Sequence, residues 1–357
     1  MDTRRFHKHL FDVGRRLIPR ECVVLCAVSG GGDSMALLHG LHAINAMRGC
    51  GWGLHVAHLD HGLPHDSAEM MAFVRDAAAG LGLPFVAERV DVVAAAGETG
   101  ESIEEAGRKV RYDFLERAAE NAGARVVALG HHADDQAETV LYRILRGTGL
   151  RGLAGMPERR PIRGGVEIEI VRPLLEMRRE DLRDYLRRRE LGFMHDATND
   201  DVHAARRNWM RHELIPLIEG TLNPEVAVAL VRLARQAGRA HGAIETLAAA
   251  AFERLRLEST QGSVVLDSAG LSALPGALRA ELITYVLERL GAGRKAIGFE
   301  RIEAVTDVAE GDGRLRRIEL PGGMLVERRG ARLIFLGGVG ASSVQLRGEQ
   351  PVEGTCP

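Results

Sequence analysis

The sequence has few of the residues that mark several common protein classes. It contains four cysteines, Cys22, Cys26, Cys50 and Cys356, and none of them forms a C-x-x-C pair. Zinc sites, iron–sulfur sites and a disulfide scaffold therefore have little support, and Cys22 and Cys26 are interpreted as small core residues. No apolar run approaches the roughly 20 residues that a membrane span requires, and the N-terminal segment is amphipathic rather than a signal sequence. These absences favour a cytoplasmic protein with no membrane partner.

Lysine is also scarce, because only Lys8, Lys109 and Lys295 occur and nearly all positive charge is arginine. The net charge of −2, with 45% hydrophobic and 27% charged residues, is ordinary for a globular protein. It gives no global argument for nucleic-acid binding. Arginines nevertheless cluster between Arg178 and Arg211. A basic helix face is often only solvated, but such a cluster is also a candidate phosphate-binding surface.

The order of apolar runs and helical patterns predicts the fold class. Apolar runs at 22–28, 53–59, 84–90 and 125–130 alternate with helical patterns at 33–47, 66–81, 101–122 and 135–146. This βαβα order is typical of an α/β, doubly wound, mostly parallel sheet with helices on both faces. Residues 147–165 are predicted to form a long loop. We predict a catalytic domain over 1–215, a mainly helical domain with short strands over 216–340, and a disordered tail over 341–357.

A glycine-rich segment follows the first strand candidate: Ser29, Gly30, Gly31, Gly32, Asp33 and Ser34. Glycines allow positive φ and close approach to a ligand, and the N–H groups of such a turn and of the next helix form a nest for an anion. A phosphate is the expected ligand. Because Asp33 is also negatively charged, we expect a cation beside it, such as Mg²⁺ on a nucleotide. The lysine of a P-loop is absent, as is the G-x-G-x-x-G fingerprint. The alternative is an ordinary glycine-rich turn in which Ser34 caps the helix.

Polar residues at the ends of other strand candidates are expected in the same crevice, because ligands of parallel sheets sit beyond the carboxyl ends of the strands. His131 stands at such an end, and Asp135 and Glu138 share a face of the next helix. Carboxylates placed there hold Mg²⁺ or accept an ammonium group, although helix capping explains them as well. Arg108 and Arg111, one helical turn apart, form either a clamp for a polyanion or a solvated surface.

The glycine-rich segment resembles the S-G-G-x-D-S signature of the PP-loop, or N-type, ATP pyrophosphatases, which cleave ATP between the α- and β-phosphates. Taken together, six motifs resemble the tRNA(Ile)-lysidine synthetase family over about residues 20–220. They are Ser29–Ser34, His58–Leu63, Gly107–Tyr112, His131–Thr139, Arg172–Leu175 and Arg207–Arg211, and Asp196–Asn199 resembles the family's segment before the last of them. The chain departs from the family pattern at Gly107, Pro64 and Trp209–Met210.

The resemblance implies ligation of free L-lysine to C2 of the wobble cytidine of tRNA(Ile) with a CAU anticodon, through an adenylated cytidine. ATP and Mg²⁺ are then the cofactors, AMP and diphosphate the by-products, and the C-terminal domain a tRNA-binding domain.

The resemblance also implies roles for residues of this chain. The ATP site consists of Ser29, Gly30, Gly31, Gly32, Asp33 and Ser34. Asp33 and Asp135 are the metal ligands. Glu138 and His131 orient lysine or remove its proton, and Arg111 and Arg207 contact the cytidine nucleotide or polarise its adenylate. The implied catalytic set is Asp33, Arg111, His131, Asp135, Glu138 and Arg207.

Three other functions stay open at this stage. Another PP-loop tRNA enzyme, such as a 2-thiocytidine synthetase, is the nearest, but the cysteines are badly placed for it. An amidating synthetase with a small acceptor has no use for Arg207–Arg211, and a non-catalytic RNA-binding protein leaves the clustered acids unexplained. The oligomeric state is open as well, with a homodimer among the alternatives.

Overall fold

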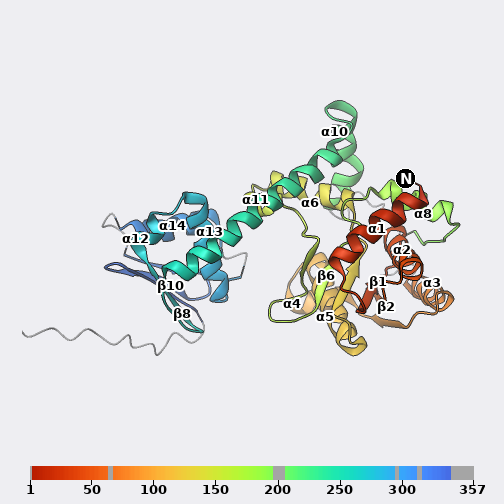
Figure 1. The fold of residues 1–357 in the computed structure, drawn as a ribbon, viewed down its shortest axis with the longest axis horizontal. Coiled ribbons are helices and arrows are strands. Elements are labelled where there is room, and N and C mark those ends of the chain that lie inside the picture. Colours follow the sequence, from red (N-terminus) through yellow and green to blue (C-terminus); the bar gives the residue numbers. More distant parts are fainter. Residues whose placement is uncertain (1, 63–66, 196–205, 294–296, 312–315, 339–357) are drawn as a thin grey trace, which may run out of the picture. The chain divides into compact units, whose positions relative to one another are not determined.

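The computed structural model describes residues 2–62, 67–195, 206–293, 297–311 and 316–338. Figure 1 shows the ribbon, in which the chain forms two compact units, residues 1–238 and 239–357. Each unit is described by itself. The division falls within helix α11 (Val226–Leu255) rather than at residue 215. The domain limits given above stay a prediction, because compactness alone does not identify a folding unit.

The first unit is built on a six-stranded sheet in the order β3-β2-β1-β4-β6-β5. All neighbouring strands are parallel except β5, which runs antiparallel to β6. Each of the four predicted strands is confirmed to within a residue at either end. The strands are β1 (Val23–Ala27), β2 (Gly53–Asp60), β3 (Phe85–Arg89), β4 (Val126–Leu129), β5 (Arg159–Pro161) and β6 (Glu169–Val171).

Helices cover both faces of this sheet, as the doubly wound prediction requires (Figure 1). Alternate residues of β1 point to opposite faces: Val24 and Cys26 join one core cluster, and Leu25 joins the other. The first cluster lies under α1, α2, α3 and α8, and the second lies under α5. The bounds are α1 (Thr3–Leu17), α2 (Gly32–Arg48), α3 (Ser67–Gly80), α4 (Val92–Thr99), α5 (Ile103–Ala122), α6 (Ala133–Leu145) and α8 (Arg179–Arg188).

The predicted loop over residues 147–165 is wrong in part. It contains the short helix α7 (Leu150–Leu153) and the edge strand β5, which pairs with β6. A run rich in glycine, proline and arginine gives no periodic signal for so short a strand, so only its non-local partner reveals it. Further along, one helical stretch combines α9 (Arg206–Trp209), a π-helical segment η2 (Met210–Leu214) and α10 (Ile215–Thr221).

The second unit contains an antiparallel sheet, which corrects the prediction of a mainly helical C-terminal part. Its strand order is β7-β8-β11-β10-β9. The central pair joins Ser263–Asp267 to Arg332–Leu336, a long-range pairing that local patterns do not show. Residues 321–323 link β9 to β10, and residues 330–331 link β10 to β11. The elements are β7 (Arg256–Ser259), β8 (Ser263–Asp267), β9 (Arg317–Leu320), β10 (Met324–Arg329), β11 (Arg332–Leu336), α12 (Ser268–Ser272), α13 (Gly276–Arg289) and α14 (Phe299–Glu310).

Within the described part of the chain, no single helix has the length and apolar character to cross a membrane. One bent pair, residues 210–221 with 226–255, meets the requirement by length and composition alone. The predicted tail at 341–357 lies outside the described residues.

Candidate active site

The glycine-rich loop joins the end of β1 to the start of α2, as predicted. The N–H of Ser29 donates to Ser34 Oγ over 3.2 Å, and Ser34 Oγ donates to the Gly31 carbonyl over 2.9 Å. Gly30 has φ +96°, a conformation that side chains disfavour. The first N–H groups of a helix have no acceptor within the helix. Those of α2 are therefore available to a ligand held by the loop. The arrangement can hold a phosphate group.

Two other segments hold this loop in place. The N–H of Met194 donates to the Gly30 carbonyl over 2.9 Å, and the half-exposed ring of Phe193 lies beside Gly32. On the other side, Gly130 at the end of β4 approaches so closely that a Cβ atom there would meet Asp33 and Ser34 backbone atoms at 3.1 Å. The loop is therefore fixed between the ends of two strands and the segment after α8. Sequence reasoning missed Phe193 and Met194, because they follow no motif.

His132, which was not among the predicted site residues, is the centre of the acidic site. Its ring is fully buried, and its Nε2 atom lies 3.2 Å from Asp33 Oδ2 and 3.5 Å from Asp135 Oδ2. Burial lowers the pKa of His132, but the carboxylates of Asp135, Asp134 and Asp33 outweigh it and raise the pKa to about 9. The sequence signal was present in the His131–His132 pair, but local patterns do not show which ring turns inward. His131 itself is half-buried at the end of β4.

Asp134, also absent from the predicted set, joins His132 to an arginine pair at the start of α8. Its Oδ1 accepts a hydrogen bond from Arg178 Nε over 3.0 Å, and its Oδ2 accepts one from the Arg179 N–H over 2.8 Å. Burial raises the pKa of Asp134, but His132, the Arg179 N–H and Arg178 hold it far below its ordinary value. The basic segment that begins at Arg178 is therefore partly bound to acidic residues rather than wholly solvated.

The predicted pair Asp135 and Glu138 does share a face of α6, and Arg211 binds both. Arg211 Nε and Nη2 donate to the two oxygens of Glu138 over 2.6 and 3.0 Å, and Nη2 also lies 3.3 Å from Asp135 Oδ1. The Glu138 side chain is only 3% exposed. Burial raises the pKa of Asp135, but His132, His131 and Arg211 together lower it below the ordinary value. Arg211 lies in η2, and π-helical turns are frequent at functional sites.

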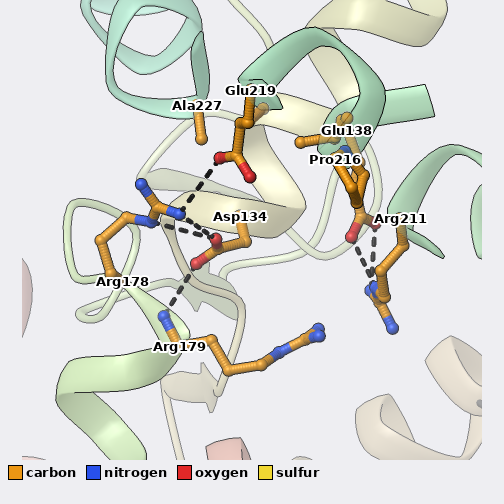
Figure 2. Close-up of a pocket in the computed structure, with 10 residues that line it drawn as sticks. Asp134, Glu138, Arg178, Arg179, Arg211, Pro216, Glu219 and Ala227 are labelled. Carbon is orange, nitrogen blue, oxygen red and sulfur yellow. Dashed lines mark hydrogen bonds and ion pairs between the residues drawn. The ribbon is translucent and has the colours of Figure 1, made fainter. Parts of the chain in front are cut away.

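A cavity of about 140 Å³ opens beside these residues (Figure 2). Its lining carries both signs of charge, so it suits a small molecule that itself carries both. The lining residues are Asp134, Ala137, Glu138, Arg178, Arg179, Arg211, Ile215, Pro216, Glu219 and Ala227.

Arg111 belongs to α5 and lies beside His61, which directly follows β2. Its Nη2 atom is 3.3 Å from His61 Nε2. No contact shown by the described residues brings Arg111 to Asp135 or Glu138. The backbone of Arg207 is in α9, but its side chain lies outside the described part, as do Leu63, Pro64 and Asp196–Asn199.

The predicted metal ligands, Asp33 and Asp135, both face His132 Nε2 and so lie near one another. Their hard oxygen donors fit Mg²⁺, which is commonly held by one or two carboxylates plus substrate phosphates. A separate group of His241, Glu245 and Glu281 lies in the second unit. There the two ring nitrogens face different carboxylates, at 3.3 and 3.7 Å, which is the geometry of an ion-pair network.

Comparison with known proteins agrees with this geometry. A family model described as "PP-loop domain" matches residues 3–218, which include every residue of the acidic site. The chain belongs to the PP-loop domain family. The match includes residues 29–34, the glycine-rich loop described above.

Several curated relatives carry one name, tRNA(Ile)-lysidine synthase. A protein from Thermus thermophilus is 39% identical over 94% of this chain and 60% of its own length. That from Geobacter sulfurreducens is 38% identical over 85% of this chain and 63% of its own. That from Dehalococcoides mccartyi is 33% identical over 90% of this chain and 67% of its own. The chain thus spans less than two thirds of the length of the first two.

Among solved structures, the U34-tRNA thiolase NcsA from Methanococcus maripaludis is similar, with a TM-score of 0.51 at 14% sequence identity. The match covers 65% of this chain and 77% of that one. At this identity the likeness concerns the PP-loop fold alone.

Proposed function

We propose that this chain ligates free L-lysine to C2 of the wobble cytidine of tRNA(Ile) with a CAU anticodon, at the expense of ATP. The observation that carries the proposal is that a glycine-rich phosphate loop and a cavity lined by carboxylates and arginines lie at one edge of the sheet. The named relatives, which are 33–39% identical over most of this chain, supply the substrate identity.

The first step is adenylation of the base. The cytidine C2 carbonyl oxygen attacks the α-phosphorus of ATP, and diphosphate leaves. The N–H groups of residues 29–34 stabilise the charge that develops on the phosphates. Asp33 and Asp135 would hold Mg²⁺, which neutralises phosphate charge when it is bound. The buried ring of His132 lies between these two carboxylates, 3.2 Å from Asp33 Oδ2 and 3.5 Å from Asp135 Oδ2, and so holds them in position.

The second step joins lysine to the activated base. The ε-amino group attacks C2, the C2–O bond breaks, and AMP leaves with the oxygen. Because the ε-ammonium must first lose a proton, an acceptor is required nearby. We assign lysine to the cavity of Figure 2, where Glu138 orients the amine and the arginines receive the carboxylate. His131, which follows β4 and does not line this cavity, is proposed to assist Glu138. Arg211 pairs with both oxygens of the Glu138 carboxylate.

The RNA is expected to enter at the open edge of the sheet. Arg111, beside His61, and Arg207 are proposed to contact the cytidine nucleotide or polarise its adenylate. A single-stranded anticodon loop offers a base that can be turned out of its stack.

The alternative of a thiolating enzyme is disfavoured by the cysteines that the structure describes. Cys26 and Cys50 are buried, and burial raises the pKa of the Cys26 thiol to about 12. A nucleophilic thiol needs the opposite shift. Neither cysteine, nor the half-buried Cys22, lies in the loops at the carboxyl ends of the strands.

The test is incubation of the protein with ATP, labelled lysine and a CAU-anticodon tRNA(Ile) transcript. We expect label on this RNA and none on a methionine tRNA with the same anticodon, with AMP formed in step. Absence of label from both RNAs, from a protein that binds ATP, would contradict the proposal.

Two variants test the assigned roles in the same assay. Asp135→Asn and Glu138→Gln keep the shape of each side chain and should lower turnover by roughly 10²-fold or more. Glu138→Ala is a poorer probe, because it leaves the buried Arg211 charge unpaired and destabilises the fold. A matched control is Glu120→Gln, which removes an exposed carboxylate near the end of α5 that does not line the cavity. Turnover like wild type in both variants would remove these carboxylates from the catalytic set.

A further inference from the structure

Four side chains from three segments meet near the carboxyl end of β6, and we call them the Tyr112 arginine cluster. Tyr112 and Arg108 belong to α5, Arg160 to β5, and Arg172 directly follows β6. The guanidinium carbons of Arg108 and Arg160 lie 4.9 and 4.8 Å from the centre of the Tyr112 ring. Both distances are those of cation–π contacts.

Arg172 is the buried member of the cluster. Only 2% of it is exposed, its Nη1 donates to the Pro157 carbonyl over 2.7 Å, and its Nε has no hydrogen-bond partner within the described chain. A buried, unsatisfied donor on a charged group is costly. An occupant that accepts a hydrogen bond from Nε would remove this cost.

The cluster also lacks negative charge. In the part of the chain that the structure describes, no carboxylate pairs with Arg108, Arg160 or Arg172. Neighbouring arginines behave differently: Arg159 pairs with Glu169, and Arg163 pairs with acids of α5. The charges of Arg159 and Arg163 are therefore balanced by carboxylates, whereas those of the three cluster arginines are not.

The titration of the cluster agrees with an excess of positive charge. Burial lowers the pKa of Arg172 to about 10, and Arg160 and Arg108 contribute to the same shift. Burial raises the pKa of the Tyr112 phenol, but the three arginines outweigh it and lower the pKa below its ordinary value. The Tyr112 shift indicates a positive potential that an anion would relieve.

We propose that the Tyr112 arginine cluster binds a backbone phosphate of the RNA substrate, next to the nucleotide that is modified. The inference rests on the proposed function for the identity of the RNA. Guanidinium groups suit phosphate because their N–H donors match its oxygens.

The place of the cluster separates it from the phosphates of ATP. In the sheet order, β6 lies two strands from β1, a lateral distance of about 10 Å. The PP-loop follows β1 and has its own phosphate nest. Arg172 follows the carboxyl end of β6, which is parallel to β4 and β1, so the cluster opens at the same edge as the reaction site. A chain of nucleotides that crosses this edge reaches both.

The experiment measures binding of fluorescent CAU-anticodon tRNA(Ile) at several salt concentrations without ATP, and lysine incorporation separately. The variants are Arg108→Gln, Arg160→Gln and their double mutant. The matched control is Lys109→Gln, which removes one positive charge from an exposed neighbour on the same helix. Arg172 is left intact, because its burial ties it to folding.

We expect each variant to weaken RNA binding about tenfold and to reduce the slope of log affinity against log salt by about one. Lys109→Gln should change neither. Binding and slopes like wild type in the double mutant, or equal losses in Lys109→Gln, would overturn the proposal. Thermal unfolding with added pyrophosphate is a further test. If the variants lose the protection that pyrophosphate gives to wild type but bind RNA unchanged, the cluster holds free phosphate and the proposal is overturned.

The two proposals fail in different ways. If wild type binds RNA with a salt slope that the variants reduce but transfers no lysine, the cluster stands and the lysine assignment falls. If wild type transfers lysine and the variants bind and react like it, the function stands and the cluster falls.

Discussion

At the scale of residues, one buried histidine organises the acids of the site. His132 lies between Asp33 and Asp135 through Nε2, and its Nδ1 lies 3.4 Å from Asp134 Oδ2. Arg178 and Arg179 also contact Asp134, and Arg211 contacts Asp135, so the ring and three arginines surround these carboxylates together. The raised pKa of His132 is therefore a property of the whole site, and it couples the geometry of the PP-loop to pH.

This coupling predicts how stability depends on pH. The folded pKa of about 9 lies above the ordinary value of 6.5, so the contribution is complete below pH 6.5 and is lost as pH rises through 9. His132→Asn keeps a polar side chain at the start of α6 but does not titrate. Between about pH 6 and pH 10 wild type should lose on the order of 1–3 kcal/mol of unfolding free energy relative to this variant.

Urea denaturation followed by tryptophan fluorescence measures this difference. Trp52 and Trp209 both belong to the first unit and so report on it. Parallel curves of stability against pH for the two proteins would show that His132 is neutral in the folded state.

The sequence indicated several residues that lie together in the structure, but it did not indicate which side chains contact one another. Asp33, Asp135 and Glu138 were identified, because their offsets from strand ends and along one helix face are local properties. Arg211 and Arg178 were seen only as members of a basic segment, because their acidic partners lie on α6, far away in the sequence. His132 was missed for the same reason, since burial of one ring of a pair depends on packing.

At the scale of elements, the position of the PP-loop depends on the close approach of β4 to α2. Gly130 has no positive φ, so alanine fits its backbone, but the added Cβ would meet Asp33 and Ser34 backbone atoms at 3.1 Å. Gly130→Ala should displace the loop, weaken ATP binding several-fold and cost roughly 1–3 kcal/mol of stability. Gly97→Ala is the control, because nothing lies within 4 Å of its Cβ.

Calorimetric titration with ATP, together with tryptophan-detected unfolding, checks this prediction. An affinity for ATP in Gly130→Ala equal to that of wild type and Gly97→Ala would mean that the loop adapts independently of β4.

The elements themselves differ in how far the sequence determines them. The parallel strands are continuous apolar runs buried on both faces, and their boundaries were predicted closely. The strands β5 and β8 were missed, since a three-residue edge strand and a strand paired with residues 332–336 depend on distant partners. The π-helical turn at Met210–Leu214 has no composition signal, yet it carries Arg211.

At the scale of the whole molecule, the chemistry and the second unit are separate. Every residue assigned to ATP, lysine or the cytidine lies in the first unit, whereas the second has its own core and sheet. The resemblance implies that the C-terminal domain binds tRNA. If it does so outside the anticodon arm, its contacts act equally on the ground state and the transition state. Such uniform binding changes KM and leaves kcat unaffected.

Lysine incorporation into full-length tRNA(Ile) and into its isolated anticodon stem-loop tests this division. We expect the stem-loop to be modified with a similar kcat and with a KM for RNA at least roughly tenfold higher, since each lost increment of about 1.4 kcal/mol in binding costs a factor of ten. Raising the salt concentration should reduce the difference in KM between the two RNAs, because the contacts that the stem-loop lacks are mainly with phosphates. Equal KM values would show that the first unit alone binds the RNA, and a stem-loop with greatly reduced kcat would show that the second unit takes part in assembling the active site.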